Sequence, residues 1–226
     1  MQKLMKTLYL GTDPSHFQCE GELVHFPVIK IVPRPQQEWQ HVLAEMDLFT
    51  HLIFTSKNAV CLFFDVYKKP LHDKTFAAVG QVTASHLKDF GYKADLIAEE
   101  ETQEGLIEIL KRQNLQNSYF FLPRSSLSRP ALVYFFKDRG IRYRAVDLYD
   151  THYDRPAIPV DLKEFDQIIF TSPSTVEAFF QIYKTVPAQV KLVPIGPITK
   201  QAIDRLLRLL LQTASVSVRV FLVLLF

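Results

Sequence analysis

Two copies of one hydroxyl and glycine motif are the residues in this sequence whose types and spacing could support chemistry. In each copy a Thr-Ser pair ends an apolar run, and a glycine 24 residues after the serine is followed three positions later by a threonine. The second copy lies 116 residues after the first. Hydroxyls and glycines beside free backbone N–H groups can hold carboxylates or phosphates. The candidate anion contacts are Thr55, Ser56, Gly80 and Thr83 in the first copy, and Thr171, Ser172, Gly196 and Thr199 in the second.

The segments around these motifs also match, which indicates an internal repeat. LIFTSKNAVCLFF (52–64) and IIFTSPSTVEAFF (168–180) share seven positions. Each copy has an apolar run of strand length, an amphipathic stretch, and a second apolar run that ends in glycine before another helical stretch. This alternation predicts parallel βαβ units. A serine or asparagine at the start of the amphipathic stretch also suits a helix N-cap, so the alternative is that each Thr-Ser pair only caps a helix.

The rest of the chain predicts more strands and helices of the same kind. Gly91 and Gly140 follow helical patterns and precede strands, as helix-terminating glycines do. Roughly ten strands interleaved with helices predict the α/β class, with two doubly wound parallel sheets. Further strands are expected at 7–12, 26–33, 94–98, 119–125 and 143–151, and helices at 37–47, 102–112, 129–139 and 197–210.

The carboxyl ends of the predicted strands supply the other candidate residues, because ligands of open parallel sheets bind there. Arg124 ends one strand and could make a bidentate contact with an anion. Asp147, Asp150 and Asp154, near Tyr149, indicate a solvated strand exit and not an acid/base pair. The sequence has no lysine-containing phosphate loop, no dinucleotide-binding glycine motif, no hydrolase nucleophile elbow and no His-Glu-x-x-His zinc motif.

Charge and composition exclude several classes. The 26 basic and 24 acidic residues give a net charge of +2 without a long basic run, which argues against nucleic-acid binding. Cys19 and Cys61 are isolated and fit a reducing compartment without disulfides. The N-terminal segment predicts a first strand and not a signal peptide. The stretch 206–226 is apolar but is interrupted by charges such as Arg208 and Arg219, so we expect no membrane span.

Taken in order, the motifs resemble the uroporphyrinogen-III synthase family. The resemblance runs from about Leu8 to Ile203 and rests on FTSKNAV, AVGQVTASHL, FLPRS, VDLYDT, IIFTSPSTVEAFF and IGPITKQAI. It implies two flavodoxin-like lobes, one inserted into the other and joined by a two-segment connector. Residues 1–33 with 155–226 would form the first lobe and residues 36–152 the second. The proline-rich segments IVPRP and YDRPAIP fit such connectors.

The family resemblance also implies a reaction. A cyclising hydro-lyase of haem biosynthesis would close the linear tetrapyrrole hydroxymethylbilane, with loss of water and inversion of ring D, to give uroporphyrinogen III. Because the bilane cyclises unaided to the unturned isomer, the enzyme must control conformation more than supply strong acid or base. The absence of an acid/base pair agrees with this requirement.

Site residues, partners and location follow from the same resemblance. It implies no cofactor and no metal, a monomer in the cytoplasm, and a transient contact with the deaminase that makes the substrate. Tyr149, in VDLYDT, would be the catalytic residue that assists departure of the hydroxyl group. Substrate contacts would fall on Thr55, Ser56, Asn58, Gly80, Thr83, Arg124, Ser125, Ser172, Gly196 and Thr199.

The second copy of the repeat departs from the first near Leu207, where the first copy has Gly91. Ile198 also stands where some family members carry a threonine, which removes one hydroxyl contact. We interpret the altered tail as a shifted reading frame or as divergence. Two alternatives to an active synthase therefore stay open: a non-catalytic two-lobed binder of an anionic small molecule, and a degraded, inactive synthase. A pair of response-regulator-like domains would lack its phosphate-accepting acidic cluster.

Overall fold

The computed structural model describes residues 4–15 and 17–223, and these form two compact units. Unit 1 takes in the described residues up to Lys30 and those from Tyr153 onward, and unit 2 is Ile31–His152. The chain therefore passes from one unit to the other twice. The first passage lies within strand β3 and the second near the end of strand β8. The sequence-based division had put these passages near residues 33–36 and 152–155.

Unit 1 is built on a parallel sheet of four strands in the order β10-β9-β1-β2. Leu8 and Leu192 both lie opposite Ile168, and these side chains face the helices. Phe179 and Ile203 pack on this face from helices α5 and α6. The elements are β1 Lys6–Tyr9, β2 Glu22–His25, η3 Leu162–Glu164, β9 Gln167–Phe170, α5 Pro173–Ile182, β10 Lys191–Pro194 and α6 Pro197–Val223.

Unit 2 is built on a sheet of six strands in the order β3-β8-β7-β4-β5-β6, of which β8, β7, β4, β5 and β6 pair in parallel. The predicted α/β class with parallel sheets is confirmed. The strands are β3 Ile29–Pro33, β4 His51–Phe54, β5 Thr75–Ala78, β6 Leu96–Ile97, β7 Tyr119–Ser125 and β8 Arg142–Tyr153. The helices are η1 Gln36–Glu38, η2 Gln40–Leu48, α1 Lys57–Val66, α2 Gln81–Asp89, α3 Gln103–Leu110 and α4 Ala131–Asp138.

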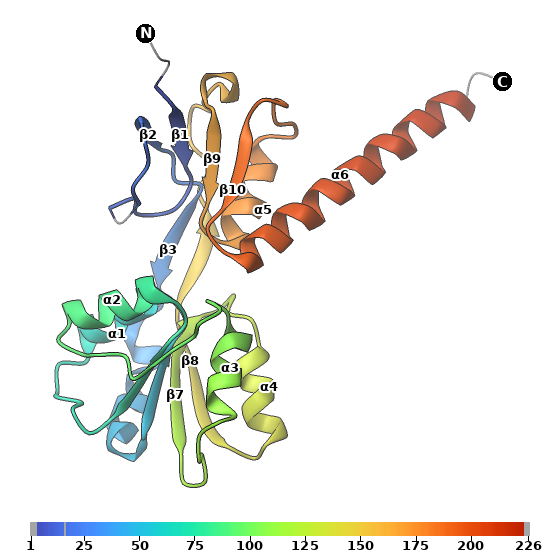
Figure 1. Ribbon diagram of the computed structural model, residues 1–226. Coiled ribbons are helices and arrows are strands. Elements are labelled where there is room, and N and C mark those ends of the chain that lie inside the picture. The colour runs from blue at the N-terminus through green and yellow to red at the C-terminus, as the bar shows by residue number, and fades with distance from the viewer. Residues whose placement is uncertain (1–3, 16, 224–226) are drawn as a thin grey trace. The chain divides into compact units, whose positions relative to one another are not determined.

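Helices cover both faces of the unit 2 sheet, α1 and α2 on one face and α3 and α4 on the other (Figure 1). Side chains alternate along β4, so Leu52 and Phe54 enter one core cluster while Ile53 enters the other. Phe63 of α1 is fully buried in the first cluster, and Leu106 of α3 is fully buried in the second. Packing on both faces thus holds β4 in place, and with it Thr55 and Ser56, which follow the strand.

Gly91 and Gly140 end α2 and α4 as predicted. Both have positive φ angles, 85° and 63°, which glycine adopts without strain. After each glycine the next residue bonds back to the helix, as Ile141 N does to Phe136 O at 2.9 Å. Together with the bond from Gly140 N to Lys137 O, at 3.1 Å, this makes the pair of hydrogen bonds that closes a helix on a left-handed residue.

Two local predictions were wrong. Residues 37–47 were expected to form an α-helix, but η1 and η2 are 3-10 helices, and neither has a side-chain N-cap bond. Strand β2 was not predicted. It has four residues at the edge of the unit 1 sheet, and Glu22 and His25 at its two ends are exposed, so it lacks the apolar run that marks the central strands.

Helix α6 was predicted to end near Leu210 but runs to Val223. In the first copy of the repeat, α2 ends at Asp89 and strand β6 and helix α3 follow. In the second copy the helix continues through the positions at which a strand would correspond to β6. Among the described residues, no helix combines the length and the apolar character that a membrane crossing needs.

Candidate functional site

Neighbouring strands of unit 2 bring several candidate residues to one edge of the sheet. Thr55 and Ser56 follow β4, Ser125 ends β7, and Tyr149 lies toward the carboxyl end of β8. The register between β7 and β8 shifts at Ser125, which pairs with Tyr149, whereas Arg124 pairs with Asp147. Such a bulge turns a side chain relative to its regular direction. No residue pattern in the sequence indicated it.

Tyr149 and Ser56 form the closest polar contact at this edge. Their hydroxyl oxygens are 2.8 Å apart, and either can donate the hydrogen bond. Ser56 is also the N-cap of α1, where its hydroxyl oxygen accepts a bond from Ala59 N at 3.2 Å. In the first copy Ser56 therefore caps the helix, as the alternative interpretation predicted, and the same hydroxyl contacts Tyr149. The helix cap fixes the hydroxyl that contacts the phenol.

The Tyr149 side chain is only 4% exposed. Burial raises the pKa of its phenol above the ordinary value near 10, and hydrogen bonds with Ser56, Asn58 and Ser125 lower the pKa in part. The phenol is thus fully protonated at neutral pH. A protonated hydroxyl held by neutral partners can donate a proton to a leaving oxygen and take it back afterwards.

Arg124 and Thr55 line a small hollow at the same edge, together with Ser128 and Arg129. Arg124 is not an isolated cation, because its Nε donates to Asp147 at 2.9 Å. The guanidinium therefore shares its charge with a carboxylate of the chain. Any contact of Arg124 with an anion would be made by the N–H groups that do not point to Asp147.

The aspartates around Tyr149 were interpreted as a solvated strand exit, and two of them also form ion pairs that were not predicted. Asp147 pairs with Arg124, and Asp150 accepts two hydrogen bonds from Arg34 at 2.9 and 3.1 Å. Arg34 lies just beyond β3, so this ion pair fastens β3 to its neighbour β8. The sequence signal for the pair was weak, since Arg34 and Asp150 are far apart in the chain.

The N-terminus of α2 carries Gly80 and Thr83, and a carboxylate of the chain itself occupies it. Glu101 Oε1 accepts a hydrogen bond from Gln81 N at 2.7 Å. Gly80 has a φ of +90°, and a Cβ there would come within 2.9 Å of the Glu101 carboxyl carbon. Thr83 is 4% exposed and faces the interior. The sequence predicted that a substrate anion binds at this helix end. It did not indicate that the carboxylate of Glu101 already lies there.

The candidate residues of the second copy lie in unit 1. Ser172 is the N-cap of α5 and forms a capping box with Thr175, whose Oγ1 accepts from Ser172 N at 3.2 Å. Gly196 precedes α6, and Thr199 in its first turn is 4% exposed. These residues repeat the local chemistry of the first copy. The capping box shows that Ser172 also has a structural role.

The site in unit 2 therefore contains the buried phenol of Tyr149, several hydroxyls, and Arg124, which is paired with Asp147. Within the described parts of the chain, no three histidine, cysteine, aspartate or glutamate residues are grouped in a way that could hold a metal ion. The arrangement suits proton transfer to an oxygen and the positioning of an anionic molecule.

Comparison with known proteins shows the family to which the chain belongs. The family model described as "Uroporphyrinogen-III synthase HemD" matches residues 18–207, which is most of the chain. The chain belongs to the uroporphyrinogen-III synthase family. This family comprises cyclising lyases of tetrapyrrole biosynthesis, and the assignment favours an enzyme over a non-catalytic binder. The match ends at residue 207, where the second copy of the repeat departs from the first.

A curated protein with a related sequence agrees with this assignment. The porphyrin biosynthesis protein HemD of Ruminiclostridium josui is 27% identical over 198 residues, which cover 82% of this chain and 39% of that protein. The chain therefore spans about two fifths of the length of that relative.

Solved synthase structures share the fold. A mutant uroporphyrinogen III synthase of the extremely thermophilic bacterium Thermus thermophilus superposes with a TM-score of 0.62 at 16% identity, over 89% of this chain and 88% of that chain. The uroporphyrinogen-III synthetase of Helicobacter pylori 26695 has a TM-score of 0.60 at 17% identity, with the same coverage. The two-lobed α/β architecture implied by the resemblance is confirmed.

Proposed function

We propose that this protein closes hydroxymethylbilane to uroporphyrinogen III. The C–O bond of the terminal hydroxymethyl group breaks, and the oxygen leaves as water after taking one proton. The substituted α-carbon of ring D then attacks the resulting methylene on ring A and forms a spiro intermediate. The bond between ring D and its other bridge breaks and re-forms at the opposite α-carbon. Ring D is thereby inverted, and one proton is returned as the ring regains its aromaticity.

The observation that carries this proposal is the buried, protonated phenol of Tyr149 beside Ser56. Its proton can pass to the departing oxygen, and the phenolate so formed accepts the proton released in the last step. Ser56 Oγ, 2.8 Å away, can donate to the phenolate and so stabilise it. Burial of the phenol excludes water, which favours cyclisation over loss of the reactive methylene to solvent.

Binding of the substrate follows from its charge, because acetate and propionate groups extend from every ring. In unit 2 we assign these contacts to Thr55, Asn58, Gly80, Thr83, Arg124 and Ser125, beside Ser56. In unit 1 we assign them to Ser172, Gly196 and Thr199. Support comes from the position of these residues at strand ends and helix N-termini, where N–H groups and hydroxyls favour carboxylates.

The further expectations for this chain are proposals of the same kind. We propose lobes of 1–33 with 155–226 and of 36–152, a monomer in the cytoplasm, and a transient contact with the deaminase that produces the bilane. The free thiols of Cys19 and Cys61 support a reducing compartment. Light scattering during gel filtration would test the monomer, and a dimer mass would contradict it.

Replacement of Tyr149 by phenylalanine tests the proposed mechanism. Tyr149→Phe keeps the ring and removes the proton donor, so we expect formation of isomer III to slow by about 100-fold, at the lower end of general acid catalysis. The control is Tyr134→Phe, because Tyr134 lies on α4 with its side chain 58% exposed. An unchanged rate for Tyr149→Phe, with unchanged thermal unfolding, would remove the phenol from the mechanism.

A further inference from the structure

Unit 2 has a second hollow at the opposite edge of its sheet from Tyr149. It has a volume of about 580 Å³ and is lined by seven residues of the segment 110–118, which leads into β7, and by residues 139–142, which lead into β8. Because β7 and β8 are parallel, both strands begin at this edge. Tyr149 lies toward the other end of β8, so this hollow is separate from the candidate active site.

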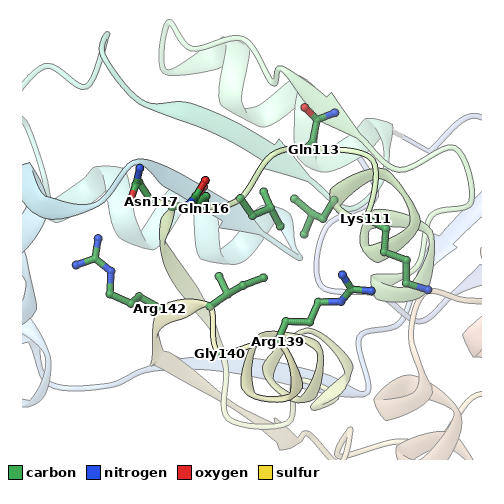
Figure 2. Close-up of a pocket in the computed structure, with 11 residues that line it drawn as sticks. Lys111, Gln113, Gln116, Asn117, Arg139, Gly140 and Arg142 are labelled. Atoms are coloured by element: carbon green, nitrogen blue, oxygen red, sulfur yellow. The ribbon is translucent and has the colours of Figure 1, made fainter.

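Three cationic side chains stand around the hollow. Figure 2 shows Lys111 and Arg139 on one side, and Arg142 and Asn117 on the other. Lys111 donates to Glu108 at 2.6 Å. Arg139 and Arg142 form no ion pair with any residue that the structure describes. Positive charge therefore exceeds negative charge along this rim.

Aromatic rings hold both arginines. The guanidinium carbon of Arg139 is 5.1 Å from the centre of the Phe135 ring, and that of Arg142 is 5.1 Å from the centre of the Tyr119 ring. A ring face restrains the guanidinium plane but uses none of its N–H donors. Both arginines thus keep their donors for a planar acidic group.

Part of the lining of the hollow is apolar. Leu115 and Ile141 line it, are half-buried, and pack against the core cluster that contains Leu110 and Phe136. Apolar side chains beside arginines that lack an ion pair among the described residues differ from an ordinary solvated basic surface. It suits a ligand with an apolar body and with charge at its ends.

We propose that this hollow binds an elongated organic dianion, with its apolar body over Leu115 and Ile141 and one carboxylate at each of Arg139 and Arg142. Both acidic groups are needed, because the two arginines lie on different sides of the hollow (Figure 2). A chain or aromatic dicarboxylate has this chemistry. The inference does not depend on the reaction assigned to Tyr149.

A series of α,ω-dicarboxylates from adipate to dodecanedioate, titrated calorimetrically into the whole protein, tests the proposal. The diacid of one chain length should bind best. The monomethyl ester of that diacid should have a dissociation constant at least about fivefold higher, since one charged contact is lost. Arg139→Gln and Arg142→Gln should each weaken binding of the diacid by a similar factor. Arg112→Gln is the matched control, because this arginine follows Lys111 but does not line the hollow.

Amide chemical shifts of the wild-type protein give a second measurement that does not require a variant to fold. On titration with the best diacid, the signals of Gly140 and Ile141 should move. Shifts confined to residues around Tyr149 would overturn the proposal. So would the absence of saturable binding up to roughly 10 mM diacid, equal binding of the monomethyl ester, or an equal loss in Arg112→Gln.

Discussion

Tyr149, the residue that we propose carries the chemistry, makes contacts that the sequence shows only in part. Its candidacy came from the VDLYDT segment, and Ser56 was found from the repeat. Their contact at 2.8 Å lies beside the shift in strand register at Ser125, which has no sequence signature. Glu101 was missed for a related reason, because its carboxylate reaches Gln81 N only after the segment beyond β6 has folded back. The sequence thus identified the hydroxyls that we propose as substrate contacts, but not the groups of the chain itself that bond beside them.

Glu101→Gln tests whether the N-terminus of α2 binds a carboxylate of the substrate. The carboxylate of Glu101 occupies this helix end, so a substrate carboxylate must compete with it. Removal of the charge should lower the KM for the bilane by about two- to fivefold, which corresponds to the usual strength of an anion at a helix N-terminus. Steady-state kinetics measures this change, with the exposed Glu99→Gln as the control. A raised KM would mean that Glu101 positions the site and does not compete for it.

Among the elements, the strands with uninterrupted apolar runs were predicted best. β4 and β9 are each followed by Thr-Ser as expected, and the last three residues of each strand are apolar and buried, as in a strand covered on both faces. The edge strand β2 and the 3-10 helices η1 and η2 were missed, since tertiary packing decides them more than local propensity does. The Arg34–Asp150 pair between β3 and β8 belongs to the same class of long-range contact.

Asp150→Asn tests the contribution of that pair to the stability of the protein. Arg34, and next Ser126, hold the pKa of Asp150 at about 2, below its ordinary value of 3.8. A lowered pKa in the folded state stabilises the protein above pH 4, and this stabilisation disappears as the pH falls through about 2. Asp150→Asn should therefore be less stable than the wild type at pH 7, and the difference should shrink below pH 4.

Urea unfolding at a series of pH values measures this difference between Asp150→Asn and the wild type. The control is Asp138→Asn, because Asp138 is exposed at the end of α4 and has no ion pair in the described part of the chain. A difference between Asp150→Asn and the wild type that stays constant from pH 7 to pH 3 would contradict an electrostatic role.

At the scale of the whole molecule, the repeat predicted two related sheets but could not give their connectivity. The inserted arrangement came from the family resemblance, and the structure divides the chain after Lys30 and after His152. Comparison of the two copies also predicted where the second copy departs from the first. Leu207 stands in place of a glycine, α6 continues as a helix beyond it, and the family match stops at residue 207.

Unit 2 should fold without the rest of the chain. Residues Ile31–His152 contain both core clusters that cover the faces of their sheet. We expect the isolated segment to unfold cooperatively in urea, with coincident fluorescence and circular dichroism transitions. Non-coincident transitions, or a poorly dispersed amide spectrum, would mean that this unit needs unit 1 for its stability.

The product formed from hydroxymethylbilane tests the central claim most directly. The purified protein is incubated with freshly prepared bilane, the products are oxidised to porphyrins, and the isomers are separated. We predict that isomer III predominates and forms faster than isomer I forms in the absence of protein. Isomer I alone, at the spontaneous rate, would contradict the assignment of synthase activity to this chain.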